Sequence, residues 1–70
     1  MFDYNKLRGR IREVFGTQSK YSEALHVSYA TLSAKLNNQT DFTQGEISKS
    51  VELLQINSAD IPAYFFTKVV

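Results

Sequence analysis

The chain has no cysteine, no tryptophan, one proline and a single histidine, His26, among its 70 residues. Without cysteine, neither disulfides nor a thiolate metal site can supplement the core. A lone histidine argues against a zinc site, so we expect no metal and no cofactor. A chain of this length forms one domain, residues 1–70, with a modest core. Its stability must therefore come from packing, from helix caps or from a partner subunit.

Long hydrophobic runs and catalytic groupings are also missing. No apolar stretch approaches bilayer length, and the N-terminal MFDYNKLRGR lacks the apolar part of a signal peptide. We therefore expect a cytoplasmic protein with no membrane role. There is no Gly-rich phosphate loop and no convergent carboxylate pair, and capping and solvent exposure explain Glu46 and Glu52. We expect the protein not to be an enzyme and assign no catalytic residue.

Charge is low but unevenly distributed. The net charge of +1 is too small to indicate nucleic acid by itself. Residues 1–40 carry six basic and three acidic side chains, a net +3, whereas residues 41–70 carry two basic and four acidic ones, a net −2. The basic half also holds the motif described below. Taken alone, the Arg8–Arg12 cluster fits an ordinary solvated helix equally well.

Apolar residues at helical spacing predict an all-α fold of five helices with no strand. Thr43 and Glu46 have the spacing of a capping box, which places a helix start at Gln44. Pro62 suits the first turn of the last helix. The first helix is capped by Asp3 and runs to about Phe15, and the second is capped by Thr17 and runs to about Leu25. The third is capped by Ser28 and runs to Leu36 or Asn37. The fourth starts at Gln44, and the fifth starts at Ser58 or Asp60.

The segment Thr17–Leu36, TQSKYSEALHVSYATLSAKL, is the most informative part of the sequence. It predicts two short helices joined by a tight turn at His26 and Val27. This spacing is that of a helix-turn-helix and indicates DNA as the ligand. The outer face of the helix that Ser28 caps is uncharged and suits a groove better than open solvent; its residues are Tyr29, Ala30, Ser33 and Ala34.

The run TQSKYSEALHVSYATLSAKLNNQT resembles the helix-turn-helix of phage Cro and repressor proteins of the lambda-repressor-like superfamily. With FDYNKLRGRI, KLNN and DIPAYFF, nearly the whole chain resembles the short Cro-like regulators of Gram-positive prophages. The resemblance implies a compact five-helix domain whose recognition helix, about residues 28–37, lies in the major groove of operator DNA. The implied function is transcriptional regulation of a phage lysis/lysogeny switch in the host cytoplasm.

The resemblance also implies which residues contact DNA. Gln18 matches a glutamine that touches a phosphate and braces the recognition helix, and Ser22 matches the small residue that lets the two helices approach. Tyr29, Ala30 and Ala34 match positions that face bases. The expected DNA-binding residues are Thr17, Gln18, Ser28, Tyr29, Ala30, Thr31, Ser33, Ala34, Lys35, Asn37, Asn38 and Thr40.

Two residues depart from the family pattern. His26 stands where relatives usually have glycine in a left-handed conformation, which histidine tolerates, so we expect a structural role for it. Lys35 occupies a place that is often apolar in relatives. We expect Leu36 to take over that packing and Lys35 to extend toward a phosphate.

The chemistry of the third helix leaves the partner open. Readout by Arg or Gln is worth about 1–3 kcal/mol per bidentate pair, and this helix has neither residue, so we expect modest base discrimination aided by DNA shape. Tyr29 is also suited to a protein interface, and Asn37 and Asn38 to shaping a turn. A second hypothesis is therefore an antirepressor or modulator that binds the phage repressor protein.

Three adjacent aromatic residues, Tyr64, Phe65 and Phe66, cannot all point inward from one helix. The surplus suggests self-association. Cro-type proteins usually bind two half-sites about 34 Å apart as symmetric dimers, so we expect a homodimer on DNA. The expected contacts are Ile61, Tyr64 and Phe65 of the last helix, with the tail Thr67–Val70.

Overall fold

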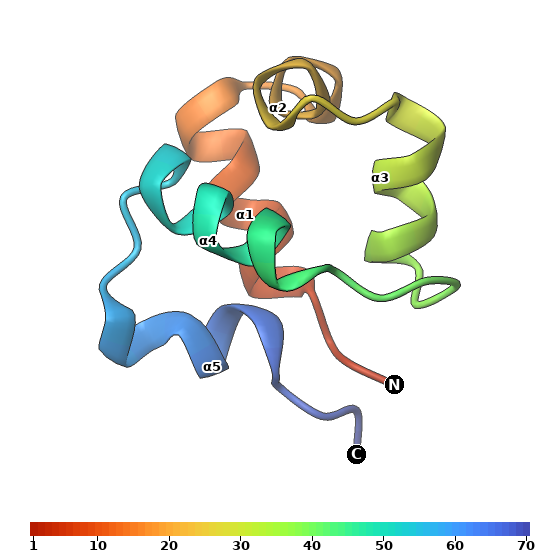
Figure 1. Ribbon diagram of the computed structural model, residues 1–70. Coiled ribbons are helices and arrows are strands. Elements are labelled where there is room, and N and C mark those ends of the chain that lie inside the picture. Colours follow the sequence, from red (N-terminus) through yellow and green to blue (C-terminus); the bar gives the residue numbers. More distant parts are fainter.

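The computed structural model describes residues 1–70 as five α-helices and one short 3-10 helix (Figure 1). The predicted all-α fold of five helices is confirmed. No helix has both the length and the apolar character needed to cross a membrane. The elements are α1 (Asn5–Phe15), α2 (Gln18–Leu25), α3 (Tyr29–Leu36), α4 (Gln44–Leu53), η1 (Ser58–Asp60) and α5 (Ile61–Phe65).

Side-chain caps fix the start of three helices where the sequence predicts them. The hydroxyls of Thr17 and Ser28 accept hydrogen bonds from the backbone N–H three residues further on, at 3.2 and 3.0 Å. Thr43 and Glu46 form the predicted capping box, in which each side chain accepts from the other residue's backbone N–H. These bonds satisfy N–H groups that have no partner inside the helix.

The two ends of the chain lie side by side (Figure 1). The N–H of Asp3 donates to the carbonyl of Thr67 at 2.7 Å, and Phe2 and Lys68 form an isolated antiparallel bridge. The cap of the first helix differs from the prediction, because Tyr4 is the N-cap residue and Asp3 accepts from the N–H of Asn5 at 2.8 Å. The terminal pairing thus ties both ends to the helical body.

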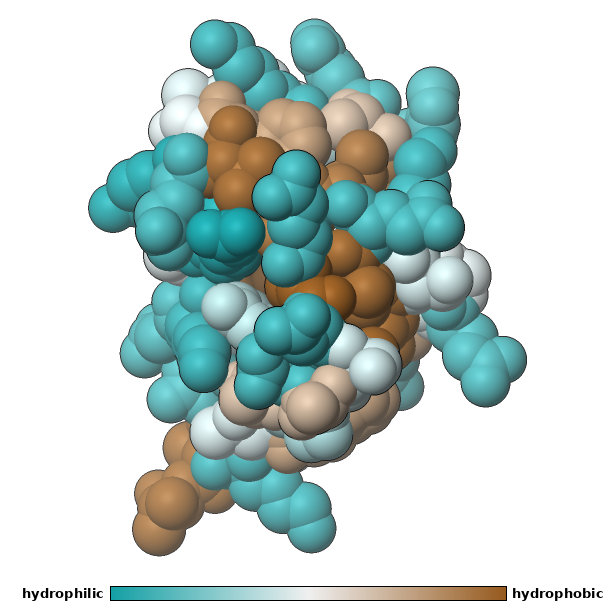
Figure 2. Space-filling view, turned by 90° about the vertical axis from the view of Figure 1, so that its left-hand side faces the viewer, coloured by the Kyte–Doolittle hydropathy of each residue, from teal (hydrophilic) through white to brown (hydrophobic).

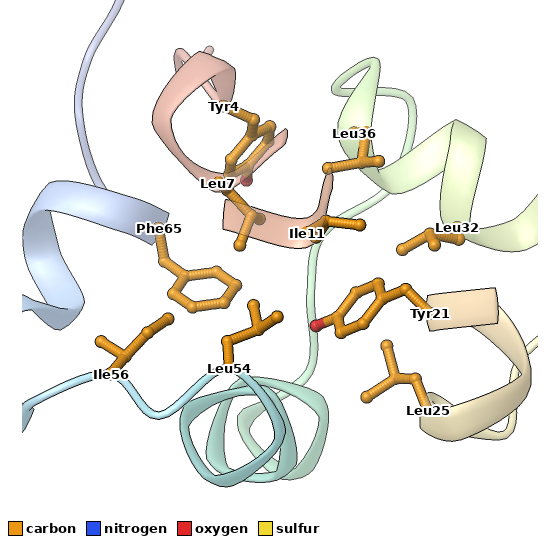
Figure 3. Close-up of a cluster of buried hydrophobic side chains, with 10 residues drawn as sticks. All are labelled: Tyr4, Leu7, Ile11, Tyr21, Leu25, Leu32, Leu36, Leu54, Ile56 and Phe65. Carbon is orange, nitrogen blue, oxygen red and sulfur yellow. The ribbon is translucent and has the colours of Figure 1, made fainter. Parts of the chain in front are cut away.

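One core joins all five helices (Figure 3). Phe42 packs edge-on against Tyr4 and Phe65, each with 5.4 Å between ring centroids, and so links the start of α1 to α5. In α3, Leu32 and Leu36 are buried on the same side of the helix, so the opposite side of α3 faces outward. The buried apolar residues are Tyr4, Leu7, Ile11, Tyr21, Leu25, Leu32, Leu36, Leu54, Ile56 and Phe65.

Hydrophilic side chains cover much of the side of the molecule that Figure 2 shows, and hydrophobic atoms are visible between them. A domain of this size buries only a modest fraction of its surface, so it cannot cover its apolar residues completely. Leu53 and Ile61, for example, pack against the core but stay half-buried. Each core contact therefore carries a large share of the stability.

We expect Leu32→Ala to lower the free energy of unfolding by about 2–5 kcal/mol, because it opens a cavity at a completely buried position. Urea unfolding followed by circular dichroism measures the change. Ala30→Ser, at an exposed position of the same helix, is the control and should change stability by less than about 0.5 kcal/mol. Equal stability of the two variants would contradict the assignment of Leu32 to the core.

Candidate functional site

A turn of three residues, His26–Ser28, connects α2 to α3. His26 has φ 62° and ψ 39°, so the expected left-handed backbone is confirmed. The N–H of Val27 donates to the carbonyl of Ser22 at 3.1 Å, which closes the end of α2. Ser22 itself is buried, and its hydroxyl donates to the carbonyl of Ser19 at 2.7 Å. Ser22 is thus buried as the resemblance implies, and its part in the close approach of α2 and α3 stays a prediction.

The outward face of α3 is uncharged. Tyr29 is 55% exposed, Ala30 and Thr31 are exposed, and Ser33 and Ala34 are half-buried. This face therefore offers one phenol ring, methyl groups and hydroxyls to a partner. It contains no cation that could meet a phosphate and no Arg or Gln that could read a base edge. We call Tyr29, Ala30, Thr31, Ser33 and Ala34 the α3 face.

Two hydrogen bonds hold the α3 face in position. Gln18 Nε2 donates to Ser33 Oγ at 2.7 Å, so the first residue of α2 braces the middle of α3. Ser28 Oγ donates to Thr31 Oγ1 at 2.8 Å while it also caps the helix. The bracing by Gln18 has the expected geometry, whereas contact of Gln18 or Thr17 with a phosphate stays a prediction.

Lys35 does not extend toward solvent. It is 7% exposed, and its Nζ lies 2.9 Å from Glu46 Oε1 and donates to the carbonyl of Asp41 at 2.9 Å. The expectation that Lys35 reaches a phosphate is therefore wrong. The physical reason is that α3 presents Lys35 to the N-terminus of α4, where the capping carboxylate of Glu46 and a free carbonyl together hold the ammonium group.

The same contacts change the ionisation of Glu46. Desolvation by burial opposes the charged form, but the hydrogen bond from the N–H of Thr43 and the adjacent charge of Lys35 outweigh it. The pKa of the Glu46 carboxyl is consequently lowered from its ordinary value of 4.5. Glu46 is a carboxylate across the neutral range and holds Lys35 inside the fold.

The loop after α3 is held by the N-terminal segment. Asn38, with φ 63°, accepts from the N–H of Phe2 and donates to its carbonyl, both at 2.8 Å. These two bonds occupy its side chain, so the structure supports a turn-shaping role and corrects the expected DNA contact. Asn37 Oδ1 accepts from Arg8 Nη2 at 2.9 Å. Asn37 and Thr40 are exposed, and their contact with a DNA backbone stays a prediction.

The residues expected at a dimer interface are only partly accessible. Phe65 is 1% exposed, so its assignment to a subunit contact is wrong: α5 turns this ring into the core. Ile61 and Tyr64 are half-buried, and Lys6 Nζ lies 4.9 Å from the centre of the Tyr64 ring. Phe66 is the exposed member of the aromatic triplet, at 49%. The sequence predicts a surplus aromatic but not which one faces outward.

Comparison with known proteins places this arrangement in a family. Residues 1–68 match a family described as a protein of unknown function, DUF739. The chain belongs to the DUF739 family. Its fold is similar to the solution structure of the modulator of repression (MOR) of the temperate bacteriophage TP901-1 from Lactococcus lactis. The two chains are 43% identical, the match covers 93% of this chain and 88% of that one, and the TM-score is 0.81. Among curated proteins, none matched the chain.

We expect Glu46→Gln to destabilise the fold by about 3 kcal/mol or more, because it leaves the buried Lys35 ammonium without an anion. Lys35→Met should cost less, because Glu46 keeps the hydrogen bond from the N–H of Thr43. Urea unfolding of both variants measures the two losses. Equal losses, or no loss in Glu46→Gln, would contradict the role of this ion pair.

The same pair predicts acid sensitivity. Because the folded-state pKa of Glu46 is lowered, its contribution to stability is complete above about pH 4.5 and is lost as the pH falls through the lowered value. Unfolding measured across acidic pH should show this loss in the wild type and a weaker one in Glu46→Gln. An identical pH profile for the two proteins would contradict it.

Proposed function

We propose that this protein regulates a phage genetic switch as a modulator of repression, by binding the phage repressor protein through the α3 face. The observation that carries the proposal is the uncharged character of that face around the half-exposed ring of Tyr29. The cores of protein interfaces are enriched in tyrosine and poor in charge, whereas DNA-binding surfaces are strongly positive. An uncharged face therefore favours a protein partner.

The structural neighbour supports the same proposal. That protein is named as a modulator of repression, and its sequence is 43% identical to this chain over most of both lengths. Lys35 is buried and the side chain of Asn38 is bonded to the backbone of Phe2, which removes two of the contacts expected with a DNA backbone. Both points favour the hypothesis of an antirepressor or modulator over that of a Cro-like DNA-binding repressor.

Direct binding of operator DNA by a Cro-like helix-turn-helix is the competing proposal. The observation that favours it is the position of α3, which is braced by Gln18 and presented outward after a short turn.

The salt dependence of the binding affinity distinguishes the two proposals. The logarithm of a DNA affinity falls with the logarithm of salt concentration, with a slope of about −0.9 for each phosphate neutralised. Binding of a protein through a largely uncharged face should depend less steeply on salt.

A gel-shift titration tests the function. The DNA beside the gene is titrated with the neighbouring repressor, with this protein, and with both. We expect this protein alone to leave the DNA unshifted and to change the shift produced by the repressor. A steeply salt-dependent shift by this protein alone, with no effect on the repressor, would overturn the proposal in favour of the DNA-binding regulator.

We expect Tyr29→Ala to weaken repressor binding by about 2 kcal/mol, because a central tyrosine is the residue of this face most suited to be a hot spot. Isothermal titration calorimetry measures the affinity. Phe66→Ala is the matched control, since it removes an aromatic ring of similar exposure outside α3. A larger effect of Phe66→Ala than of Tyr29→Ala would place the repressor on the terminal side of the molecule instead.

A further inference from the structure

A basic cleft lies next to the α3 face, where the first half of the chain has its excess of positive charge. It encloses about 300 Å³ between α1, the start of α2 and the end of α3. Two buried apolar residues, Ile11 and Leu36, form part of its lining. Arg8 and Arg12, one turn apart on α1, both line this cleft.

The structure holds Arg8 in position but leaves most of its donors free. Its Nη2 donates to the carbonyl of Leu36 at 3.2 Å and to Asn37 Oδ1 at 2.9 Å. These acceptors are neutral, so the positive charge is not compensated. A guanidinium group has five N–H donors in a fixed plane, and those on Nε and Nη1 make no hydrogen bond within the protein. Arg8 is therefore a fixed cation that still has donors for a ligand.

Arg12 is exposed and has no acidic partner. The two ion pairs of the protein involve other cations, Arg10 with Glu13 and Lys35 with Glu46. No aspartate or glutamate lines the cleft. Two arginines thus line a partly apolar cleft that contains no acidic residue, an arrangement that is complementary to a carboxylate with a short aliphatic stem.

Gln18 makes the cleft continuous with the α3 face. It lines the cleft, and its amide also donates to Ser33 on α3. A protein docked on the α3 face would therefore also cover the mouth of the cleft. Covering two unpaired cations is costly unless the partner supplies a negative group. The partner must bring an anion to this place if it is to bind tightly.

We propose that the cleft receives an aspartate or glutamate side chain of the repressor, which the guanidinium groups of Arg8 and Arg12 bind as a carboxylate. The proposal rests on the proposed function and names the chemistry of the partner at this contact. Planar guanidinium groups bind carboxylates through paired hydrogen bonds, and Ile11 and Leu36 offer apolar contact for the methylene stem.

Arg12→Glu tests the proposal without disturbing the core, because Arg12 is exposed. Lys20→Glu is the matched control: it makes the same change of net charge at an exposed position of α2 that does not line the cleft. Repressor affinity is measured by calorimetry, and circular dichroism checks that both variants are folded. We expect Arg12→Glu to weaken binding about tenfold or more beyond the effect of Lys20→Glu.

A charge exchange then identifies the occupant. Each exposed aspartate or glutamate of the repressor is changed to arginine and combined with Arg12→Glu, and one combination should restore binding.

Equal affinities of Arg12→Glu and Lys20→Glu, with wild-type binding intact, would overturn the carboxylate site alone. Failure of the wild type to bind repressor would overturn the proposed function and the site with it. Loss of DNA binding in Arg12→Glu with unchanged repressor binding would assign the cleft to a phosphate instead.

Discussion

The structure depends on how α3 is anchored to a small core. Only Leu32 and Leu36 of this helix are buried apolar residues, and they lie on one side of it. Because they fix the rotation of the helix about its axis, they also determine that Tyr29 and Ala30 face outward. A helix of eight residues would not hold its conformation alone in water. The outward face thus exists because the opposite side is buried.

Buried polar contacts restrict how the packed helices are oriented relative to one another. Lys35 and Glu46 join α3 to the start of α4, and the hydroxyls of Tyr21 and Ser50 join α2 to the end of α4. Burial raises the pKa of the Tyr21 hydroxyl, so this group stays neutral and remains a hydrogen-bond partner. No buried side-chain polar atom lacks a partner. We interpret these pairs as constraints on the relative placement of the helices, since apolar contacts alone specify orientation weakly.

The sequence predicted those features that depend on near neighbours. The caps at Thr17 and Ser28 and the capping box at Thr43 act over three residues, so their spacing is visible in the chain and the helix starts follow. The left-handed backbone at His26 was implied by the resemblance, in which glycine is usual at that place. The outward side of α3 was also predictable, because it depends on the spacing of two leucines within the helix.

The errors concern residues whose partners lie far along the chain. In the sequence, the capping box was sufficient to explain why a glutamate stands at position 46. Its second role, as the partner of Lys35, was therefore not predicted. Asn38 is occupied by Phe2, which is 36 positions away, and no local pattern indicates such a contact. The burial of Phe65 required knowledge of how α5 packs against Phe42. The sequence shows the Arg8–Arg12 cluster but not the cleft, because the cleft forms only where α1 meets Gln18 and the end of α3.

The distribution of charge is the reason to favour a protein partner over DNA. Lys35 is neutralised by Glu46, and Arg10 donates to the carbonyl of Leu54 and lies 3.8 Å from Glu13. Arg8 and Arg12 line one cleft, which Gln18 connects to the α3 face, so these two cations are grouped at one place rather than spread along the face. A duplex presents phosphates at regular intervals along a groove, so its affinity for a protein is highest when cations are distributed along the binding surface. A concentrated pair of guanidinium groups next to an uncharged face corresponds better to the single carboxylate and apolar surroundings that a folded protein can offer.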